Sequence, residues 1–432
     1  MSLYVKLTAF LLCGIASLAT SVVSADEEPS AEDVQAQVKQ LIGDLDADRL
    51  SVRREAEQRL LKLGPAALPH LPPPELIPQP GVRQILRRLR IQLENQQARL
   101  SAKASHVTLK GDFPLEEILR AINEQTGNKF DTSQLPAPLL ERPTHVDFQG
   151  TPFWRVVDQL ADTSRLNFNI DESRAALQLR PANDDPTEAA VGYSGAFRIA
   201  VTSIRRREEH RDVRFSLVIL AEPRLRPLFF SYAARDWTAK TSDGRELPVR
   251  NPDAYLNMPL AEGGRTALMT IDFIGADDPV DAISVSGEVS MTTAAGEEEI
   301  RFTDLGQSQG VSRRRGGVTV ILDKVAAQEY ATAKYSARFK VAVAYDAGGP
   351  AFESHRTWIY HNRVYLETDD GERIDFPGGQ QNSLSRTGAV VIEYPFPKLD
   401  LPLSRYAFVY VAPTLIVNIP VKVHFDSLRV EN

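Results

Sequence analysis

One short pattern is written twice between residues 106 and 170, and it constrains the fold more than any other feature of the chain. A segment with alternating apolar residues begins at His106 and leads into a helical pattern, and the same order returns at His145 (145 − 106 = 39 residues later). Alternation is the period of a β-strand, whereas apolar residues at i, i+3, i+4 and i+7 line one face of a helix. The sequence therefore predicts a small duplicated βαβ–βαβ domain at 105–182. Its inward helical positions are Leu115, Ile118, Leu119 and Ile122 in the first copy and Phe153, Val156, Val157 and Leu160 in the second.

The same segment resembles a known family of small domains. The residues that carry the resemblance are Pro114 to Leu119 with Gln125-Thr126-Gly127, then Pro152 to Leu160, and the closing strands around Phe168 and Leu177-Gln178-Leu179. With these residues, 105–180 is similar to the short N-terminal domain of secretins and TonB-type receptors (STN domain). In that family the domain is a periplasmic binding and assembly module, so the resemblance implies an interaction role. No secretin pore can be read in the sequence that follows it.

The first 25 residues have the features of a secretory signal peptide. Lys6 precedes an apolar run from Leu7 to Leu18, and Val23-Ser24-Ala25 forms a small-residue cleavage site before Asp26. A retained membrane anchor is the alternative, but the apolar run is short for a membrane span. Cys13 is the only cysteine, so the mature chain offers no thiol for disulfides, catalysis or metal binding. We predict a secreted protein of the periplasm or cell envelope, with no transmembrane segment after cleavage.

Residues 26–104 carry helical patterns interrupted by prolines. Apolar residues at helical spacing run from Val34 to Leu45 and from Val52 to Leu63, and a third helix starts near Gly81. Seven prolines fall between positions 65 and 80 and predict an extended, semi-rigid connector.

Part of this helical region resembles HEAT-type repeats of the kind found in secreted planctomycete-type proteins. The resemblance rests on Asp46 to Ala56 together with Leu63 to Leu68. It covers one or two units, whereas a solenoid normally needs about three, so the segment is expected to pack on a neighbour. The third helix also carries a basic face, which is either a solvated surface or a docking site for an acidic partner or anionic lipid. Its residues are Arg83, Arg87, Arg88 and Arg90.

Short β-type segments fill the C-terminal half, after a polar linker at 183–186. One of these segments runs from Ala267 to Ile274. Their spacing is typical of β-sandwiches. We predict two tandem all-β sandwich domains, at 192–308 and 316–432. With the helical segment and the small βαβ–βαβ domain, they make the chain a multidomain α+β protein.

The two predicted sandwiches also share a sequence pattern. Thr241 to Leu247 corresponds to Thr368 to Ile374, and each stretch contains an Asp-Gly pair. An Asp-Gly pair between strands is typical of a tight hairpin, because its turn needs positive φ. These aspartates are an alternative calcium site, but no twelve-residue calcium-loop spacing supports it. We expect the two turns to lie on equivalent hairpins.

No local motif indicates an enzyme. Gly306 to Gly310 matches G-x-S-x-G, yet no apolar helix follows the serine as a nucleophile elbow requires. His355 and His361 are six residues apart, which is not the spacing of a zinc pair. Phosphate-binding loops, dinucleotide fingerprints and H-E-x-x-H are absent from the sequence. The formal net charge of −7 argues against nucleic-acid binding. We predict no catalytic residue, no cofactor and no metal ligand.

The predicted function is non-enzymatic protein–protein interaction or assembly in the envelope, with oligomeric state left open. An envelope protein would bind by β-strand addition at a sheet edge. The strand that closes the duplicated domain is the candidate edge, because it is short and leads into the linker. It comprises Leu177, Gln178, Leu179 and Arg180.

The alternative function is a carbohydrate-binding or carbohydrate-active protein whose site no local motif reveals. An exposed row of Trp237, Trp358 or tyrosine residues would favour a carbohydrate-binding module. A pair of acidic residues in a cleft would favour hydrolysis.

Overall fold

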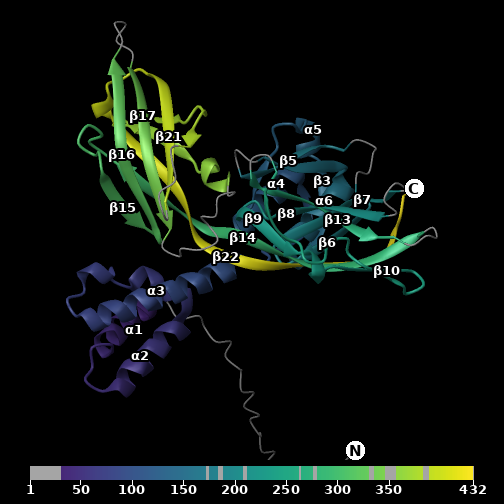
Figure 1. Ribbon diagram of the computed structural model, residues 1–432, viewed down its shortest axis with the longest axis horizontal. Coiled ribbons are helices and arrows are strands. Elements are labelled where there is room, and N and C mark those ends of the chain that lie inside the picture. The colour runs from purple at the N-terminus through teal and green to yellow at the C-terminus, as the bar shows by residue number, and fades with distance from the viewer. Residues whose placement is uncertain are drawn as a thin grey trace, which may run out of the picture. The chain divides into compact units, whose positions relative to one another are not determined.

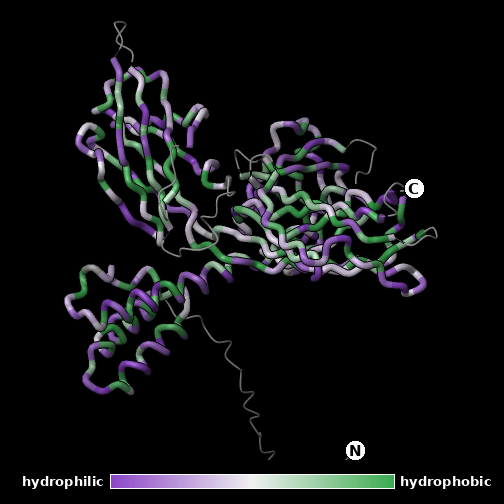
Figure 2. The backbone as a smooth tube through the Cα atoms, viewed as in Figure 1, coloured by the Kyte–Doolittle hydropathy of each residue, from purple (hydrophilic) through white to green (hydrophobic). Residues whose placement is uncertain are grey.

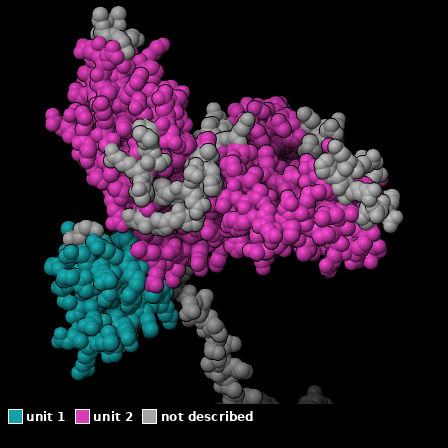
Figure 3. All heavy atoms as spheres, viewed as in Figure 1, with its two compact units in different colours: residues 1–90 teal, residues 91–432 magenta. Residues whose placement is uncertain are grey.

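The computed structural model describes most of residues 31–431 of the chain. It divides into two compact units, residues 1–90 and 91–432 (Figure 3). The fold is mixed α+β and mostly β, with a helical N-terminal segment and several sheets. The predicted signal peptide and the linker at 183–186 lie outside the described residues. Within 31–431 the segments not described are 172–174, 183–187, 208–211, 262–263, 276–279, 330–334, 346–356 and 383–388.

The predicted helices of the N-terminal segment are present. They are α1 (Ala31–Asp44), α2 (Leu50–Leu63) and α3 (Pro80–Ser101), and α3 runs across the boundary between the two units. Each buries the apolar face that its spacing predicts. The buried residues are Val34, Val38 and Leu41 in α1 with Leu45 directly after it, Ala56 and Leu60 in α2, and Val82, Leu86, Leu89 and Leu93 in α3.

The proline-rich connector between α2 and α3 is not extended, which corrects the prediction. It folds into two short 3-10 helices, η1 (Gly64–His70) and η2 (Pro74–Leu76). Proline suits the start of such a helix, because its fixed φ near −65° is helical and the missing N–H would have no partner in the first turn. Ala67 and Leu71 are buried, so the connector packs into the first unit.

The duplicated domain, called the module below, has the predicted order of elements. β1 pairs antiparallel with β3, and a second sheet has the order β2-β5-β4. All eight predicted inward helical residues belong to one buried cluster. The elements are β1 (His106–Pro114), α4 (Leu115–Thr126), β2 (Lys129–Asp131), α5 (Ala137–Leu140), β3 (Pro143–Pro152), α6 (Phe153–Ser164), β4 (Leu166–Asp171) and β5 (Ala176–Pro181).

Leu119→Asp and Val157→Asp are each expected to unfold the module. Leu119 is 5% exposed and Val157 is 3% exposed, so aspartate at either place is an unpaired buried charge and costs several kcal/mol. Hydrogen exchange of the full chain should show lost protection across β1 to β5. Arg120→Asp, at an exposed position of α4, is the control and should leave protection unchanged. Native-like protection in either core variant would show that the helical register is wrong.

Three sheets build the C-terminal half, and hydrophobic residues recur along their strands (Figure 2). A four-stranded sheet contains β6 (Ala190–Ser194), β7 (Phe197–Arg207), β8 (Asp212–Ala221) and β13 (Thr266–Ile274). A five-stranded sheet contains β15 (Val311–Arg315), β16 (Val318–Glu329), β17 (Tyr335–Tyr345), β20 (Gln381–Asn382) and β21 (Val390–Leu399). The eight-stranded sheet contains β9 (Arg226–Ala233), β10 (Thr238–Thr241), β11 (Glu246–Leu247), β12 (Tyr255–Pro259), β14 (Ala282–Phe302), β18 (Val364–Thr368), β19 (Arg373–Asp375) and β22 (Tyr406–Arg429).

Two long strands, β14 and β22, pair antiparallel and run from one core to the other (Figure 1). The first core lies between the four-stranded sheet and one end of the eight-stranded sheet, and it includes Val421, Val423 and Phe425 from the end of the chain. The second core lies against the five-stranded sheet and includes Ile300 and Phe302. Each core therefore uses residues of both halves.

This exchange corrects the prediction of two sandwiches that follow one another along the chain. The ranges 192–308 and 316–432 each give one long strand to both cores. The sequence pattern predicts separate short β-type segments, such as 283–289 and 300–305. In the structure each set of segments belongs to one continuous strand. Along β14 the change from one core to the other falls between Met291, which is in the first core, and Ala294, which is in the second.

The two Asp-Gly turns lie on equivalent hairpins, as the sequence predicts. One turn joins β10 to β11, and β10 pairs with β14; the other joins β18 to β19, and β18 pairs with β22. The strand order is β11-β10-β14-β22-β18-β19. It is symmetric about the β14–β22 pair, because β10 and β11 occupy the same places in one half as β18 and β19 do in the other. Gly244 and Gly371 have φ of 87° and 83°, which is the conformation that the turn requires.

Candidate functional site

The strand predicted as a free edge is the central strand of its sheet. β5 lies between β2 and β4, and Gln178 is paired with Asp131 on one side and with Asn169 on the other. A last strand can insert between two earlier ones, and sequence order does not reveal this. Proline at 178 would disrupt a strand that is paired on both sides. The predicted binding edge is therefore wrong at Leu177, Gln178, Leu179 and Arg180.

The arginines predicted as a docking face bind within the first unit. Arg83 and Arg90 donate hydrogen bonds to carbonyl oxygens of the connector at 2.9 and 3.0 Å. Arg88 donates to the Glu57 carboxylate of α2 at 2.5 Å. Arg87 also has an interaction partner. A guanidinium has five N–H donors, so an arginine side chain is suited to bind carbonyl oxygens of a turn that have no backbone N–H partner. Arg83, Arg88 and Arg90 therefore have hydrogen-bond partners within the chain, and a docking role for this face stays a prediction.

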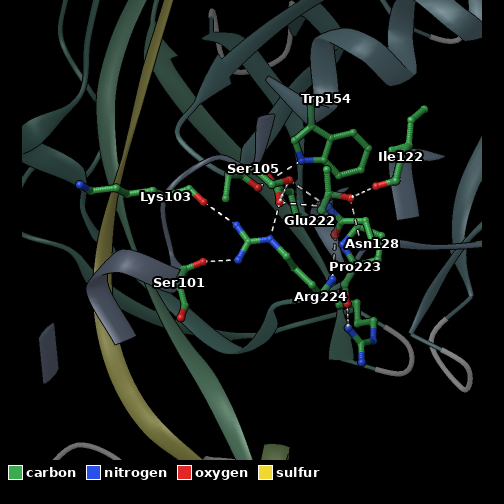
Figure 4. Close-up of polar contacts among 12 residues, drawn as sticks. Ser101, Lys103, Ser105, Ile122, Asn128, Trp154, Glu222, Pro223 and Arg224 are labelled. Atoms are coloured by element: carbon green, nitrogen blue, oxygen red, sulfur yellow. Dashed lines mark hydrogen bonds and ion pairs between the residues drawn. The ribbon is translucent and has the colours of Figure 1, made fainter. Parts of the chain in front are cut away.

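A buried carboxylate joins the module to the four-stranded sheet (Figure 4). Glu222 follows β8 and is 1% exposed. It accepts hydrogen bonds from the Ser105 N–H at 2.9 Å, the Ser105 hydroxyl at 2.7 Å, the Asn128 amide at 3.1 Å and Arg224 at 2.6 Å. Arg224 also donates to two carbonyl oxygens at and just after the end of α3. Since the charge is paired and its oxygens are occupied, the cluster is a structural joint and has no vacant group for chemistry.

A second polar cluster fixes α6 to the outer face of the same sheet. Arg198 on β7 is 3% exposed and binds Asp158 of α6 at 2.9 Å and Glu188 at 2.6 Å. The Tyr193 hydroxyl donates to Asp158 at 2.6 Å. Burial, together with the neighbouring carboxylate, raises the pKa of Tyr193 well above its usual value. The module and the sheet are thus held by two independent clusters.

A third cluster lies at the end of the first core. Asp212 is fully buried and accepts from Arg207 at 2.7 Å and from Arg250 at 2.8 Å. Asp272 accepts from Arg214 at 2.8 Å and from Arg207 at 2.9 Å. The hydrogen bond from Arg214 lowers the pKa of Asp272, which is therefore an ionised partner and not a general acid.

Two features that would indicate a sugar or metal site are not found among the described residues. Trp237 and Trp358 are 2% and 5% exposed, so neither offers a surface for stacking a sugar. No group of three or more His, Cys, Asp or Glu side chains there has the arrangement of a metal site. Within the same residues, no helix has the length and apolarity to cross a membrane.

The outer edge of β13 is open over a short window. Along a strand, backbone groups of every second residue point to the same side. On the side away from β8, the Thr266 oxygen accepts from the Ala261 N–H, the Asp272 oxygen accepts from the Arg250 N–H, and Ile274 donates to the residue 248 oxygen. The residues between these closures with the same orientation are Leu268 and Thr270. In the part of the chain that the structure describes, neither has a backbone partner on that side.

An apolar hollow of about 440 Å³ lies beside this window. The edge strands β13 and β12 line it, together with residues of β9, β8 and β7. Burial raises the pKa of Tyr232 on its wall. Ligand pockets commonly have volumes of about 300–1,000 Å³, so the hollow can admit side chains or a small apolar group. Its residues are Thr202, Ser216, Leu217, Val218, Phe230, Tyr232, Leu256, Met258, Leu268, Met269 and Thr270.

The equivalent edge in the other half of the molecule is closed. β21 pairs with β17 as β13 pairs with β8. β20 covers β21 at Ile392 and Glu393. Further along the strand, Pro395 and Pro397 have no N–H to offer. Proline and short covering strands are common protections against strand addition. Among the described residues, the duplicated fold therefore protects one edge and leaves two donors and two acceptors of the other without a backbone partner.

Sequence reasoning missed this edge although it predicted the strand. The alternation at Ala267 to Ile274 identifies β13, but which side of it carries a neighbour depends on the sheet order. Leu268 is 54% exposed and Ile274, in the same strand, is 41% exposed, but single exposed apolar residues are common on protein surfaces and do not identify an edge.

No family model, curated protein or solved structure matched this chain when it was compared with them. The resemblances to the STN domain and to HEAT-type repeats therefore stay predictions.

Proposed function

We propose that this chain is a non-enzymatic interaction protein that accepts an extended segment of a partner along the open edge of β13. The observation that carries the proposal is the pair Leu268 and Thr270, whose backbone N–H and C=O groups face outward beside an apolar hollow. Strand addition provides main-chain hydrogen bonds, and adjoining pockets select side chains. The sequence also suggests β-strand addition, but at the strand now identified as β5; the proposed edge is β13.

The charged clusters support a binding role over a catalytic one. Catalysis needs an acid, base or nucleophile that is free to exchange a proton or attack. The buried carboxylates Glu222 and Asp212 are each bound to arginine side chains. Trp237 and Trp358, which would favour the carbohydrate-binding alternative if they were exposed, are buried. The partner we propose is an envelope protein, and nucleic acid is not proposed.

We further propose that the protein is exported, with cleavage between Ala25 and Asp26. The proposal rests on Lys6, the apolar run after it and the small residues at 23–25. Intact mass spectrometry of the protein isolated from its native envelope should give a chain that begins at Asp26. A mass that includes Met1 would contradict export with cleavage and favour a retained leader.

Thr270→Pro is expected to abolish strand addition while leaving the fold intact. Proline removes the outward N–H and puts its ring in the path of an added strand. Because that N–H has no partner in the described protein, the melting temperature should fall by no more than a few degrees. The binding measurement uses decapeptides enriched from a phage-displayed random library on the full-length chain. Their affinity for the variant should fall by about tenfold or more.

Thr270→Ala is the matched control for this test. It also removes the threonine side chain, including its 3.4 Å contact with the Ser216 hydroxyl, but it keeps the backbone donor. It should bind the same peptides as the unchanged protein. Equal affinity of the proline variant, or a library with no enriched peptide, would contradict strand addition at β13. Turnover of a polysaccharide or an ester by the purified chain would support the enzymatic alternative.

A further inference from the structure

The hollow beside β13 determines which side chains an added strand can carry. Residues directly opposite one another on paired strands point to the same face of the sheet. Met269 faces the first core and is 5% exposed, so the residue opposite it would also point inward, between β13 and β12. The space that it enters is walled by Phe230, Tyr232 and Met258.

We infer that the occupant is an extended peptide of about five paired residues whose central side chain is large and apolar and fills this hollow. The inference rests on the proposed function and adds to it the chemistry of the ligand. The length follows from the closures at Thr266 and Asp272, beyond which the sheet plane is already occupied by residues 261 and 250. A segment of about 16 Å fits between them and must leave the plane at each end.

The two faces of the added strand meet different surroundings. Its neighbours on the outer face are Leu268, which is 54% exposed, and Thr270, which is also exposed. Side chains opposite these two residues lie at the outer rim of the hollow, beside the polar Ser216 and Thr270, and can be polar. The ligand consequently has a period-two pattern, with the large apolar residue at the centre and polar or small residues on either side of it.

Two methionines in the wall make the hollow adaptable. Met258 and Met269 are two of the four methionines in the chain. Methionine is unbranched and flexible, so it repacks around different apolar shapes. We therefore expect leucine, phenylalanine, methionine and tyrosine to be accepted at the centre of the peptide, and aspartate or glycine to be rejected.

A second copy of this chain does not fit the window as an edge-to-edge partner. Its own β13 is flanked by the same closures at 261 and 250, and in an antiparallel pair these would meet the closures of the first copy. A free peptide, a chain terminus or an extended loop has no such flanks.

The test uses the peptides enriched on the full-length chain, changed one residue at a time. Replacing the large apolar residue by alanine should weaken binding by about tenfold or more, and replacing it by aspartate should weaken it further. Replacing a flanking residue by serine should change the affinity by no more than about twofold. On the protein side, Met258→Trp fills the hollow and should weaken binding of peptides with a large central residue, whereas Met258→Leu should not.

The outcomes separate this inference from the proposed function. Enriched peptides that need the Thr270 donor but show no preference for a large apolar residue would overturn the inference and leave strand addition standing. Peptides that bind the Thr270→Pro and Thr270→Ala variants equally would overturn both. Because the alanine replacement is made in the peptide, the test holds even where a protein variant fails to fold. If the chain forms a dimer and the peptides dissociate it, the occupant of the edge is a second copy of the chain, and the inference of a peptide partner is overturned.

Discussion

Val423→Asp is expected to unfold the first core, although Val423 belongs to the second half of the sequence. The side chain is 2% exposed and lies in the cluster with Phe215 and Trp237. An unpaired carboxylate there should destabilise the core by about 4 kcal/mol or more. Hydrogen exchange should show protection lost in β7, β8 and β13.

The second core should keep its protection in this variant, because its share of β22 ends near Ala412. Lys422→Gln is the control, since Lys422 is exposed beside the same buried residue and glutamine puts no second negative charge opposite Glu288; the change should cost no more than about 0.5 kcal/mol. A chain ended after Ala412 tests the point again without a buried charge. It lacks Val421, Val423 and Phe425 and should also lose the first core. An intact first core in either the aspartate variant or the shortened chain would contradict the exchange of β14 and β22.

Glu222→Ala is expected to loosen the module from the four-stranded sheet. The change leaves the Arg224 guanidinium without its carboxylate and removes acceptors from Ser105 and Asn128. Breaking a buried ion pair by deleting one partner typically costs about 3–5 kcal/mol. Chemical denaturation of the full chain should show the loss, and β2 should lose protection against hydrogen exchange.

A double-mutant cycle with Arg224→Ala provides the control. If the two side chains stabilise the joint as a pair, removing both should cost less than the sum of the single changes. The expected coupling is about 1–3 kcal/mol. Strictly additive losses, or a Glu222→Ala variant that is as stable as the unchanged protein, would show that the joint depends on the surrounding packing instead.

Local patterns in the sequence determined much of the secondary structure. The apolar spacing of α4 and α6 and the burial of Leu119 and Val157 follow from periods of 3.6 and 2 residues, which are set by backbone geometry. The Asp-Gly hairpins follow from the positive φ that their turns require. Each of these features depends on residues close together in the chain, so no knowledge of distant neighbours was needed.

The tertiary structure alone decided which strands are central, which are edges and which core each strand enters. β5 was misplaced because its alternating pattern is the same whether one or both sides are paired. The partners of Arg83 and Arg90 in α3 could not be predicted, because their acceptors are carbonyl oxygens, which every residue has. The edge at Leu268 and Thr270 is open because no distant segment in the described part of the chain pairs with it. Backbone hydrogen bonds are chemically alike in all residues, and the sequence therefore specifies a strand more clearly than it specifies the neighbours of that strand.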